Sequence, residues 1–208
     1  MAGLLQDITA GFADLPPHGV GAVAVLLLYA LESEVRFGAR ARSHRAGSTD
    51  RGSTLALSLA SAVPVLGFAL AMKGRLPGAL PGMPAVAWVG VALGFAGLLI
   101  RLWAVLVLRD RYTRTLLVQE GHGIERGGPY RFVRHPGYLG SLLCLDGIAL
   151  ASGNVIVLAA SVAATSIAYA HRIRAEDAML VAAFGPPYER YSRETGALVP
   201  FVGTRPAP

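Results

Sequence analysis

The chain has 208 residues, of which 53% are hydrophobic and only 15% charged, a balance outside that of ordinary soluble domains. A membrane protein is therefore expected. Because each span takes roughly 20 residues, we expect one membrane-embedded domain over residues 1–208. The net charge of +6 comes from basic residues between apolar runs, which argues against nucleic acid as a partner. A single cysteine, Cys144, excludes a disulfide framework and a cysteine-based metal site.

Apolar segments follow one another along the chain. The last two are separated only by Ser152, Gly153 and Asn154, which favour a turn and predict a tight helical hairpin. The sequence predicts an all-α integral membrane protein with about five transmembrane helices and, after them, a cytoplasmic amphipathic helix. The predicted spans are Leu15 to Leu31, Ser53 to Met72, Pro84 to Leu108, Gly137 to Ala151 and Val155 to Ala170.

Lysine and arginine are distributed unevenly among the loops. Sixteen of the 19 lie after the first span, after the third span or in the C-terminal segment, whereas the opposite side has only Lys73 and Arg75. Cytoplasmic loops retain positive charge. We therefore expect the N-terminus outside and the C-terminus in the cytoplasm, in a membrane such as the bacterial inner membrane.

Two charged residues fall inside the predicted spans. Arg101 lies in the third span and Asp146 in the fourth. Charges in hydrocarbon are costly, so each should face the bundle interior, water or a partner. They are expected either to have a structural role, as an ion pair or with Arg101 reaching towards the membrane surface, or to line a substrate cavity.

The richest stretch for ligand binding is Gly121 to Gly140, between the third and fourth spans. Its glycines allow close backbone approach, and its Tyr, Arg and His side chains offer aromatic faces and hydrogen-bond donors. Pro136 suits the first turn of a helix, which places His135 just before the fourth span. The free N–H groups of that helix end favour an anionic ligand group. The alternative is a juxtamembrane loop that binds lipid headgroups.

The charged tail from His171 to Pro200 forms a second constellation. On a helix, Asp177 falls within an apolar stripe and Glu176 flanks it. Arg172 precedes Glu176 by four residues, a spacing that allows a helical ion pair. Asp177 is expected either to pair with a basic residue of the preceding loop or to help hold a polar ligand.

These two segments resemble the isoprenylcysteine carboxyl methyltransferase family and related phospholipid methyltransferases. GPYRFVRHPGYLG, residues 128–140, matches the signature G-P-Y-x-x-x-R-H-P-x-Y-x-G. The tail matches the pattern E-E-x-x-L followed by F-G-x-x-Y-x-x-Y, with Asp177 in place of the second Glu and with Tyr188 and Tyr191 as the two tyrosines. The resemblance covers about residues 100 to 200.

The resemblance implies a membrane methyltransferase that binds S-adenosyl-L-methionine at the cytoplasmic face and acts on a lipophilic acceptor entering from the bilayer. Residues 1–108 would supply three spans with the cytoplasmic loop 36–52. Residues 109–208 would form the catalytic part, with a cofactor loop 109–136, the hairpin 137–170 and the helix and tail 171–208. The implied cofactor residues are His122, Gly128, Pro129, Tyr130, Arg134, His135, Pro136, Tyr138, Glu176 and Asp177.

Methyl transfer from a sulfonium mainly requires that donor and acceptor be oriented and water excluded. Arg134, Glu176 and Arg193 are the candidate catalytic residues. An acceptor carboxylate needs only an orienting arginine. A phenol or an amine benefits from a base, for which His122, His135 and Glu176 are candidates.

Two other functions compete with this one. Membrane sterol reductases resemble the family around R-H-P-x-Y and bind NADPH, but their larger phosphorylated cofactor calls for more basic groups. A non-enzymatic scaffold or transporter would use Arg101 and Asp146 as its functional pair. The concentration of polar residues in the cytoplasmic segments favours the methyltransferase.

Overall fold

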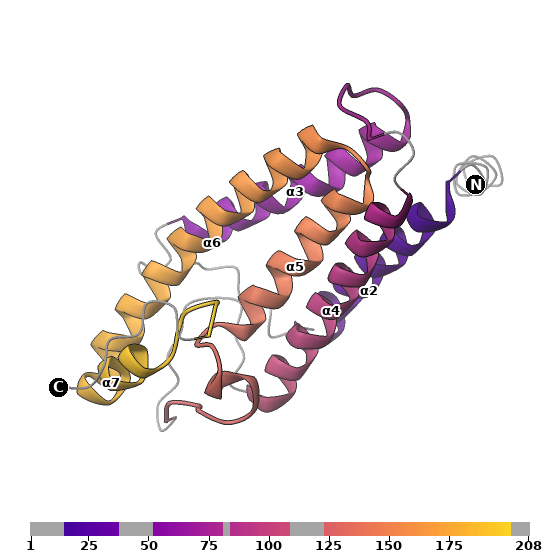
Figure 1. Ribbon diagram of the computed structural model, residues 1–208. Coiled ribbons are helices and arrows are strands. Elements are labelled where there is room, and N and C mark those ends of the chain that lie inside the picture. The colour runs from indigo at the N-terminus through magenta and orange to yellow at the C-terminus, as the bar shows by residue number, and fades with distance from the viewer. Residues whose placement is uncertain (1–14, 38–51, 81–83, 109–122, 201–208) are drawn as a thin grey trace.

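The computed structural model describes residues 15–37, 52–80, 84–108 and 123–200. Within these ranges the chain forms helices, and only two isolated bridges pair backbone in the manner of a sheet. The long helices make an elongated bundle (Figure 1). In chain order the elements are α2 (Pro17–Phe37), α3 (Ser53–Met72), α4 (Pro84–Leu108), the short 3-10 helix η3 (Gly128–Arg131), α5 (Pro136–Ala151), α6 (Val155–Phe184) and α7 (Pro186–Glu194).

Three of the described helices, α3, α4 and α6, are long and apolar enough to cross a membrane. The apolar part of α2, Pro17–Glu32, and the 16-residue α5 are shorter. Large apolar side chains such as Leu59 and Leu66 are exposed on the outside of the bundle, as suits a surface that meets lipid. The molecule is thus an all-helical membrane protein, and the count of five spans stays a prediction.

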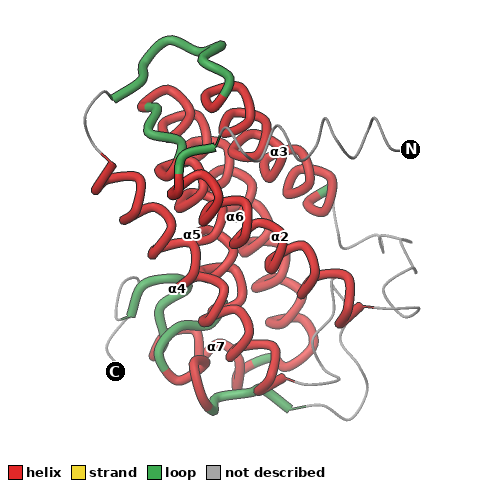
Figure 2. Tube along the Cα trace, turned by 90° about the vertical axis from the view of Figure 1, so that its right-hand side faces the viewer, coloured by secondary structure: helices red, strands yellow, loops and turns green. Residues whose placement is uncertain are grey.

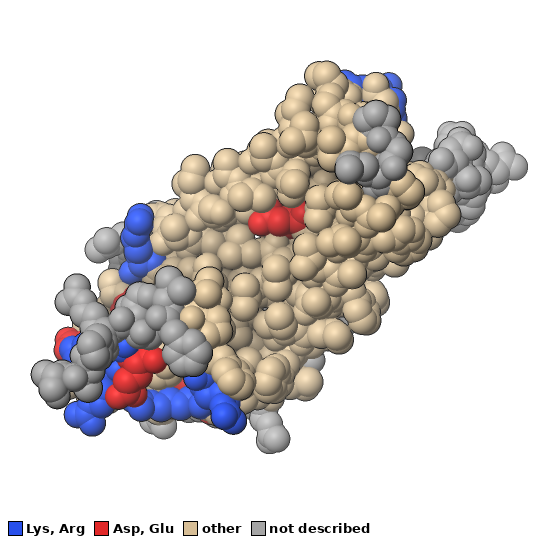
Figure 3. Space-filling view, viewed as in Figure 1, with Lys and Arg blue, Asp and Glu red and all other residues tan. Residues whose placement is uncertain are grey.

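Charged side chains gather at the ends of the bundle. Figure 3 shows basic and acidic residues concentrated at the α7 end and a mostly uncharged surface along its length. Figure 2 shows α7 at the end opposite the loop that joins α3 to α4. That loop begins with Lys73, the C-cap of α3, and also holds Arg75. The α7 end therefore carries the polar chemistry.

Glycines bring α4 and α5 into close backbone contact. A Cβ on Gly97 would lie 2.5 Å from the carbonyl oxygen of Gly140, and a Cβ on Gly147 would lie 2.6 Å from the amide nitrogen of Gly94. Small residues at such an interface let membrane helices approach until their backbones touch. The packing of α5 on α4 fixes where α5 begins, at the α7 end of the bundle.

The structure differs from the sequence-based boundaries at α6. The prediction ends the last span at Ala170 and starts a separate helix at His171, but α6 is one helix of 30 residues. Residues 155–184 contain neither glycine nor proline, so nothing interrupts the backbone hydrogen bonds. The helix ends at Gly185, whose φ of 58° breaks the helical geometry. The charged face of the tail is therefore a rigid extension of a membrane helix.

Asn154 is a main contact of the turn between α5 and α6. Asn154 caps α6 by accepting hydrogen bonds from the amides of Ile156 at 3.0 Å and Val157 at 3.1 Å. Its amide group also donates to the carbonyl of Pro77, in the loop between α3 and α4, at 3.0 Å. An asparagine at this position satisfies amide groups that the helix leaves open. The capping contacts join the two loops at the end of the bundle away from α7.

The two charged residues predicted inside the membrane do not pair with each other. Arg101 donates to Glu32 of α2 at 2.7 Å and to Ser141 of α5 at 2.8 Å. Asp146 instead accepts from Ser161 and Thr165 of α6. Arg101 thus forms a buried ion pair that ties α2, α4 and α5 together, and Asp146 bridges α5 and α6.

Candidate active site

Residues 123–135, called the connector, lead to α5 and are anchored on α4. Gly128 has a φ of +54°, and a Cβ there would approach Val107 to 2.7 Å, so both backbone and space require glycine. Pro129 and Tyr130 are buried in the turn that follows. The Tyr130 hydroxyl donates to a backbone carbonyl of α4 at 3.4 Å. These three predicted cofactor residues support the connector.

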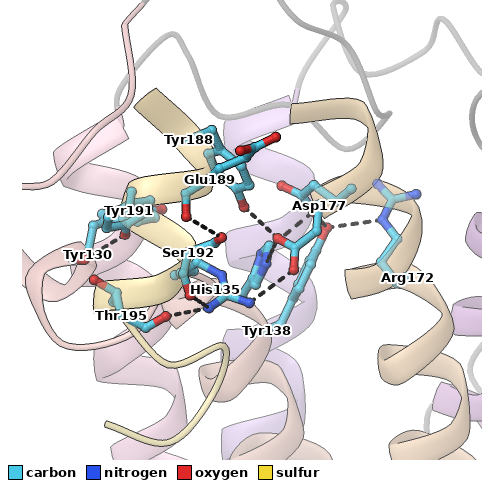
Figure 4. A network of polar contacts seen from close by, with 12 residues as sticks. Tyr130, His135, Tyr138, Arg172, Asp177, Tyr188, Glu189, Tyr191, Ser192 and Thr195 are labelled. Atoms are coloured by element: carbon cyan, nitrogen blue, oxygen red, sulfur yellow. Dashed lines mark hydrogen bonds and ion pairs between the residues drawn. The ribbon is translucent and has the colours of Figure 1, made fainter. Parts of the chain in front are cut away.

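The connector also pairs with the chain that follows α7. The Arg134 amide donates to the carbonyl of Gly196 at 2.8 Å, and the His135 amide donates to the next carbonyl at 3.0 Å. The Arg134 guanidinium donates to the carbonyls of Ser192, at 3.0 Å, and Thr195. Backbone and side chain together therefore hold the C-terminal segment against the start of α5, and Figure 4 shows Ser192 and Thr195 beside His135.

Asp177 of α6 lies where the connector, α6 and α7 meet. Its Oδ2 accepts from Arg134 at 3.0 Å. Its Oδ1 lies 2.9 Å from Nε2 of His135 and 2.5 Å from the hydroxyl of Tyr188. Both oxygens of this carboxylate are thus occupied by the protein. Of the two alternatives that the sequence left open for Asp177, the structure shows the pairing with a basic residue of the preceding loop.

Two tyrosines of α7 complete the attachment. Burial, followed by the negative charge of Asp177, raises the pKa of Tyr188 well above its ordinary value. This hydroxyl therefore keeps its proton and donates a hydrogen bond to Asp177. Burial also raises the pKa of Tyr191 to about 12. The Tyr191 hydroxyl donates to the carbonyl of Tyr130 at 2.6 Å. Both hydroxyls act as hydrogen-bond donors that hold α7 against the site.

Glu176, one residue before Asp177, has different surroundings. Its Oε2 accepts from the hydroxyl of Tyr138. That hydroxyl in turn accepts from Nε of Arg172 at 3.0 Å. Arg172 is buried and also donates to Ser53 of α3 at 2.9 Å. The phenol of Tyr138 therefore lies between a guanidinium and a carboxylate.

His135 connects the two carboxylates. Its Nδ1 lies 3.9 Å from Oε2 of Glu176, and its Nε2 faces Asp177. The imidazole stacks on the ring of Tyr138, with 5.4 Å between centroids and an interplanar angle of 9°. Figure 4 shows these side chains converging from the start of α5 and from α6. A compact polar cluster results, with Tyr138 at its centre.

The cluster leaves groups of both polarities available to a ligand. Nε of Arg134 is buried without a hydrogen-bond partner among the described residues. Within that same part of the chain, the Oε1 atom of Glu176 receives no hydrogen bond, and its side chain is 25% exposed. The N-terminus of α5 carries no side-chain cap. The amides of Tyr138 and Leu139 donate to the carbonyl of His135, and among the described residues the Gly137 amide has no acceptor and is open to an anionic group.

The site thus brings together five of the residues chosen from the sequence: Arg134, His135, Tyr138, Glu176 and Asp177. Pro136 starts α5 and is buried beneath them. Arg193 is exposed on α7 and joins none of the cluster's hydrogen bonds within the described chain. His122 lies outside the described residues.

Sequence reasoning did not choose Arg172, Tyr188 or Tyr191 as site residues. The spacing of four between Arg172 and Glu176 was the available signal, and it predicted a direct ion pair. In the structure Tyr138 stands between these two side chains, because α5 and α6 meet at this level. The two tyrosines belong to the quoted pattern of the tail, but their partners become evident only from the packing of α7.

The chain is similar to known proteins in sequence and in fold. The model of the isoprenylcysteine carboxyl methyltransferase (ICMT) family matches residues 89–182, which include α5 and most of α6. A solved structure of a eukaryotic intramembrane Ras methyltransferase, ICMT, superposes with a TM-score of 0.65 at 20% identity, over 92% of this chain and 71% of that one. At this identity the likeness concerns the fold.

Curated relatives match more than half of this chain. The chain is similar to protein-S-isoprenylcysteine O-methyltransferase A of Arabidopsis thaliana, with 30% identity over 59% of this chain and 64% of the relative. It is also similar to the cobalt-zinc-cadmium resistance protein CzcN of Cupriavidus metallidurans, with 34% identity over 54% of this chain and 46% of that protein. The matches thus span about half to two thirds of the length of these relatives.

Proposed function

Because the chain belongs through residues 89–182 to the isoprenylcysteine carboxyl methyltransferase family, we propose that it is a membrane-embedded methyltransferase. It would use S-adenosyl-L-methionine and release S-adenosyl-L-homocysteine. The observation that carries the proposal is the convergence of Arg134, His135, Tyr138 and Glu176 at one end of an apolar bundle. A polar site at the end of an apolar bundle supports the proposal of one water-soluble and one lipid substrate.

The open groups of the cluster fit the cofactor. The buried Nε of Arg134 and the uncapped N-terminus of α5 suit its amino-acid carboxylate. The Oε1 atom of Glu176 suits its ribose hydroxyls, because a carboxylate accepts from two neighbouring donors. The cofactor supplies an activated methyl group, so the protein has to align the acceptor and keep water out.

The residues around Tyr138 would orient the acceptor. Arg172 is a buried cation next to the Tyr138 hydroxyl, and a guanidinium holds a carboxylate in a defined geometry. Glu176 is the candidate base for an acceptor that must lose a proton. Asp177 acts as a positioning residue, since Arg134, His135 and Tyr188 occupy its oxygens.

The acceptor is proposed to be a lipophilic molecule that enters from the bilayer. Curated relatives are named for isoprenylcysteine, a carboxylic acid with a hydrocarbon chain. The apolar surface along α3, α4 and α6 supports the same class. The polar end of the bundle is assigned to the cytoplasmic side of a bacterial inner membrane, because the basic residues of the sequence cluster there.

The decisive experiment measures cofactor binding to the purified protein. S-adenosylhomocysteine is expected to raise the melting temperature, by an amount that corresponds to about 2.7 kcal/mol at a hundredfold excess over Kd, and NADPH is not. Glu176→Gln should weaken this binding at least about tenfold, or about 1.4 kcal/mol. Incubation with methyl-labelled cofactor and a native lipid extract should then label the acceptor for mass identification.

Glu189→Gln is the matched control, because Glu189 is an exposed glutamate of α7. It should bind S-adenosylhomocysteine like the wild type. Stabilisation by NADPH alone would identify a reductase. If neither nucleotide stabilises the protein, or if Glu176→Gln binds as the wild type does, the proposed function is wrong.

A further inference from the structure

Asp146 is a carboxylate within the apolar length of the bundle that the proposed site does not use. It lies on α5, eight residues after Tyr138, which places it about 12 Å further along the helix axis. It is only partly buried. Figure 3 shows an acidic patch in the middle of the uncharged surface on the side where Figure 1 places α5 and α6. A molecule dissolved in the bilayer can therefore reach this carboxylate.

A line of polar side chains on α6 connects Asp146 to the cluster. Ser161, Thr165, Tyr169, Arg172 and Glu176 follow one another at intervals of four, four, three and four residues, and this spacing keeps them on one face of the helix. Ser161 and Thr165 are the partners of Asp146, and Arg172 and Glu176 are the partners of Tyr138. The two polar sites thus lie at two levels of the same α5–α6 contact.

The hydrogen bonds of Asp146 leave acceptor positions of its carboxyl group unused. The Ser161 hydroxyl donates to Oδ1 at 2.7 Å. The Thr165 hydroxyl lies 3.2 and 3.3 Å from the two oxygens, but it is closer, at 2.9 Å, to the carbonyl of Ser161 on its own helix. Among the described residues Asp146 forms no ion pair with a basic group. A carboxylate offers about four acceptor positions, so at least two are available.

A purely structural role does not require this residue type. The amide oxygen of an asparagine would accept the same two hydrogen bonds without placing an ionisable group in hydrocarbon, where a charge is costly. The hairpin is also already held at its turn by Asn154. The carboxylate is better explained by a donor that comes from outside the protein.

We propose that Asp146 is a specificity subsite for the acceptor, and that it receives a hydrogen-bond donor carried on the acceptor's hydrocarbon chain. The donor is a hydroxyl or an amine, about 12 Å from the end that enters the cluster, as set by the rise of α5. This inference rests on the proposed methyl transfer, under which the reacting end of the acceptor enters the cluster and its hydrocarbon chain extends towards Asp146. It restricts the acceptor class to lipids with a second polar group near the middle of the chain.

The test uses dicyclohexylcarbodiimide, a lipid-soluble reagent that modifies carboxyl groups. The full-length protein in lipid nanodiscs is treated with the reagent, and the modification of the Asp146 peptide is measured by mass spectrometry. Octadecanoic acid and its mid-chain hydroxy and amino analogues serve as protecting probes. The hydroxy or amino acid should protect Asp146 at a concentration about tenfold lower than the parent acid does.

Two variants separate recognition from folding. Asp146→Asn should keep its melting temperature within a few degrees, and the three acids should raise that melting temperature by equal amounts. Ser161→Ala keeps the carboxylate and should retain the preference for the hydroxy or amino acid. Equal protection of Asp146 by the three acids, or a preference that survives in Asp146→Asn, overturns the subsite. S-adenosylhomocysteine binding is measured in parallel. If S-adenosylhomocysteine does not bind, the proposed methyltransferase function is wrong. The labelling of Asp146 tests the subsite alone.

Discussion

Glu176 and Asp177 are adjacent carboxylates with different tasks. Asp177 is occupied by Arg134, His135 and Tyr188, whereas Glu176 accepts only from Tyr138 within the described chain and keeps one oxygen open. The first therefore holds the connector and α7 together. The second is free to meet a ligand, which is why Glu176 is the residue chosen for the binding test.

The Tyr191 hydroxyl makes a pH-dependent contribution to stability. Its pKa is raised to about 12, against about 10 in an unfolded chain. A raised folded pKa gives stability that is present below pH about 10 and is lost as pH rises towards about 12. Tyr191→Phe should lower stability by about 1 kcal/mol at neutral pH, and this deficit should shrink in the alkaline range. Thermal melts across that range would contradict the prediction if the deficit stayed constant.

Among the helices, the contact between α4 and α5 sets the position of the site. Gly94, Gly97, Gly140 and Gly147 let the two backbones touch, and α5 then delivers His135 and Tyr138 to the ligand end. On the other side, α6 continues past the membrane segment without a break and brings Glu176 to the same level. The site is assembled where these two rigid helices end.

Gly147→Ala should therefore disturb both stability and the site. The added Cβ would lie 2.6 Å from an amide nitrogen of α4, and such overpacking costs about 1–3 kcal/mol. A lower melting temperature and weaker S-adenosylhomocysteine binding are expected. Gly123→Ala is the matched control, because a Cβ at Gly123 meets no atom within 4 Å. Equal melting temperatures for the two variants would mean that the close approach of α4 and α5 is not required.

For the whole molecule, the two ends of the bundle differ in chemistry. The α7 end holds the polar cluster and most of the charge shown in Figure 3. The opposite end joins the α3–α4 loop to the α5–α6 turn through Asn154. Such a division suits a protein that meets a soluble cofactor on one side of the membrane and takes its second substrate from the lipid.

The proposed orientation predicts which end an impermeant reagent can reach. A cysteine replacing Arg75 should react with a membrane-impermeant maleimide in intact cells, and a cysteine replacing Glu189 should react only after permeabilisation; both positions are exposed. The native Cys144 is buried and serves as the common background. Labelling of position 189 alone in intact cells would reverse the topology.

Much of this protein could be predicted from local sequence. Helix limits such as Ser53–Met72 and Pro84–Leu108 follow from hydropathy and from proline, glycine and charge at their ends, all of which act within a few residues. The motifs also located the connector and the acidic helix. The expected break at Ala170 was wrong because hydropathy marks where a membrane segment ends, whereas α6 continues as a helix to Phe184, before Gly185 with its φ of 58°.

The partners of individual side chains depended on the tertiary structure. Arg101 binds Glu32, 69 residues away, and Arg172 reaches Tyr138, 34 residues away. Which carboxylate is occupied and which is open depends on the rotation of α6 against α5 and on the closure of α7. The sequence by itself determined the membrane class, the helices and the residue types of the site. Long-range packing alone decided their contacts, because no local pattern sets the angle at which two helices meet.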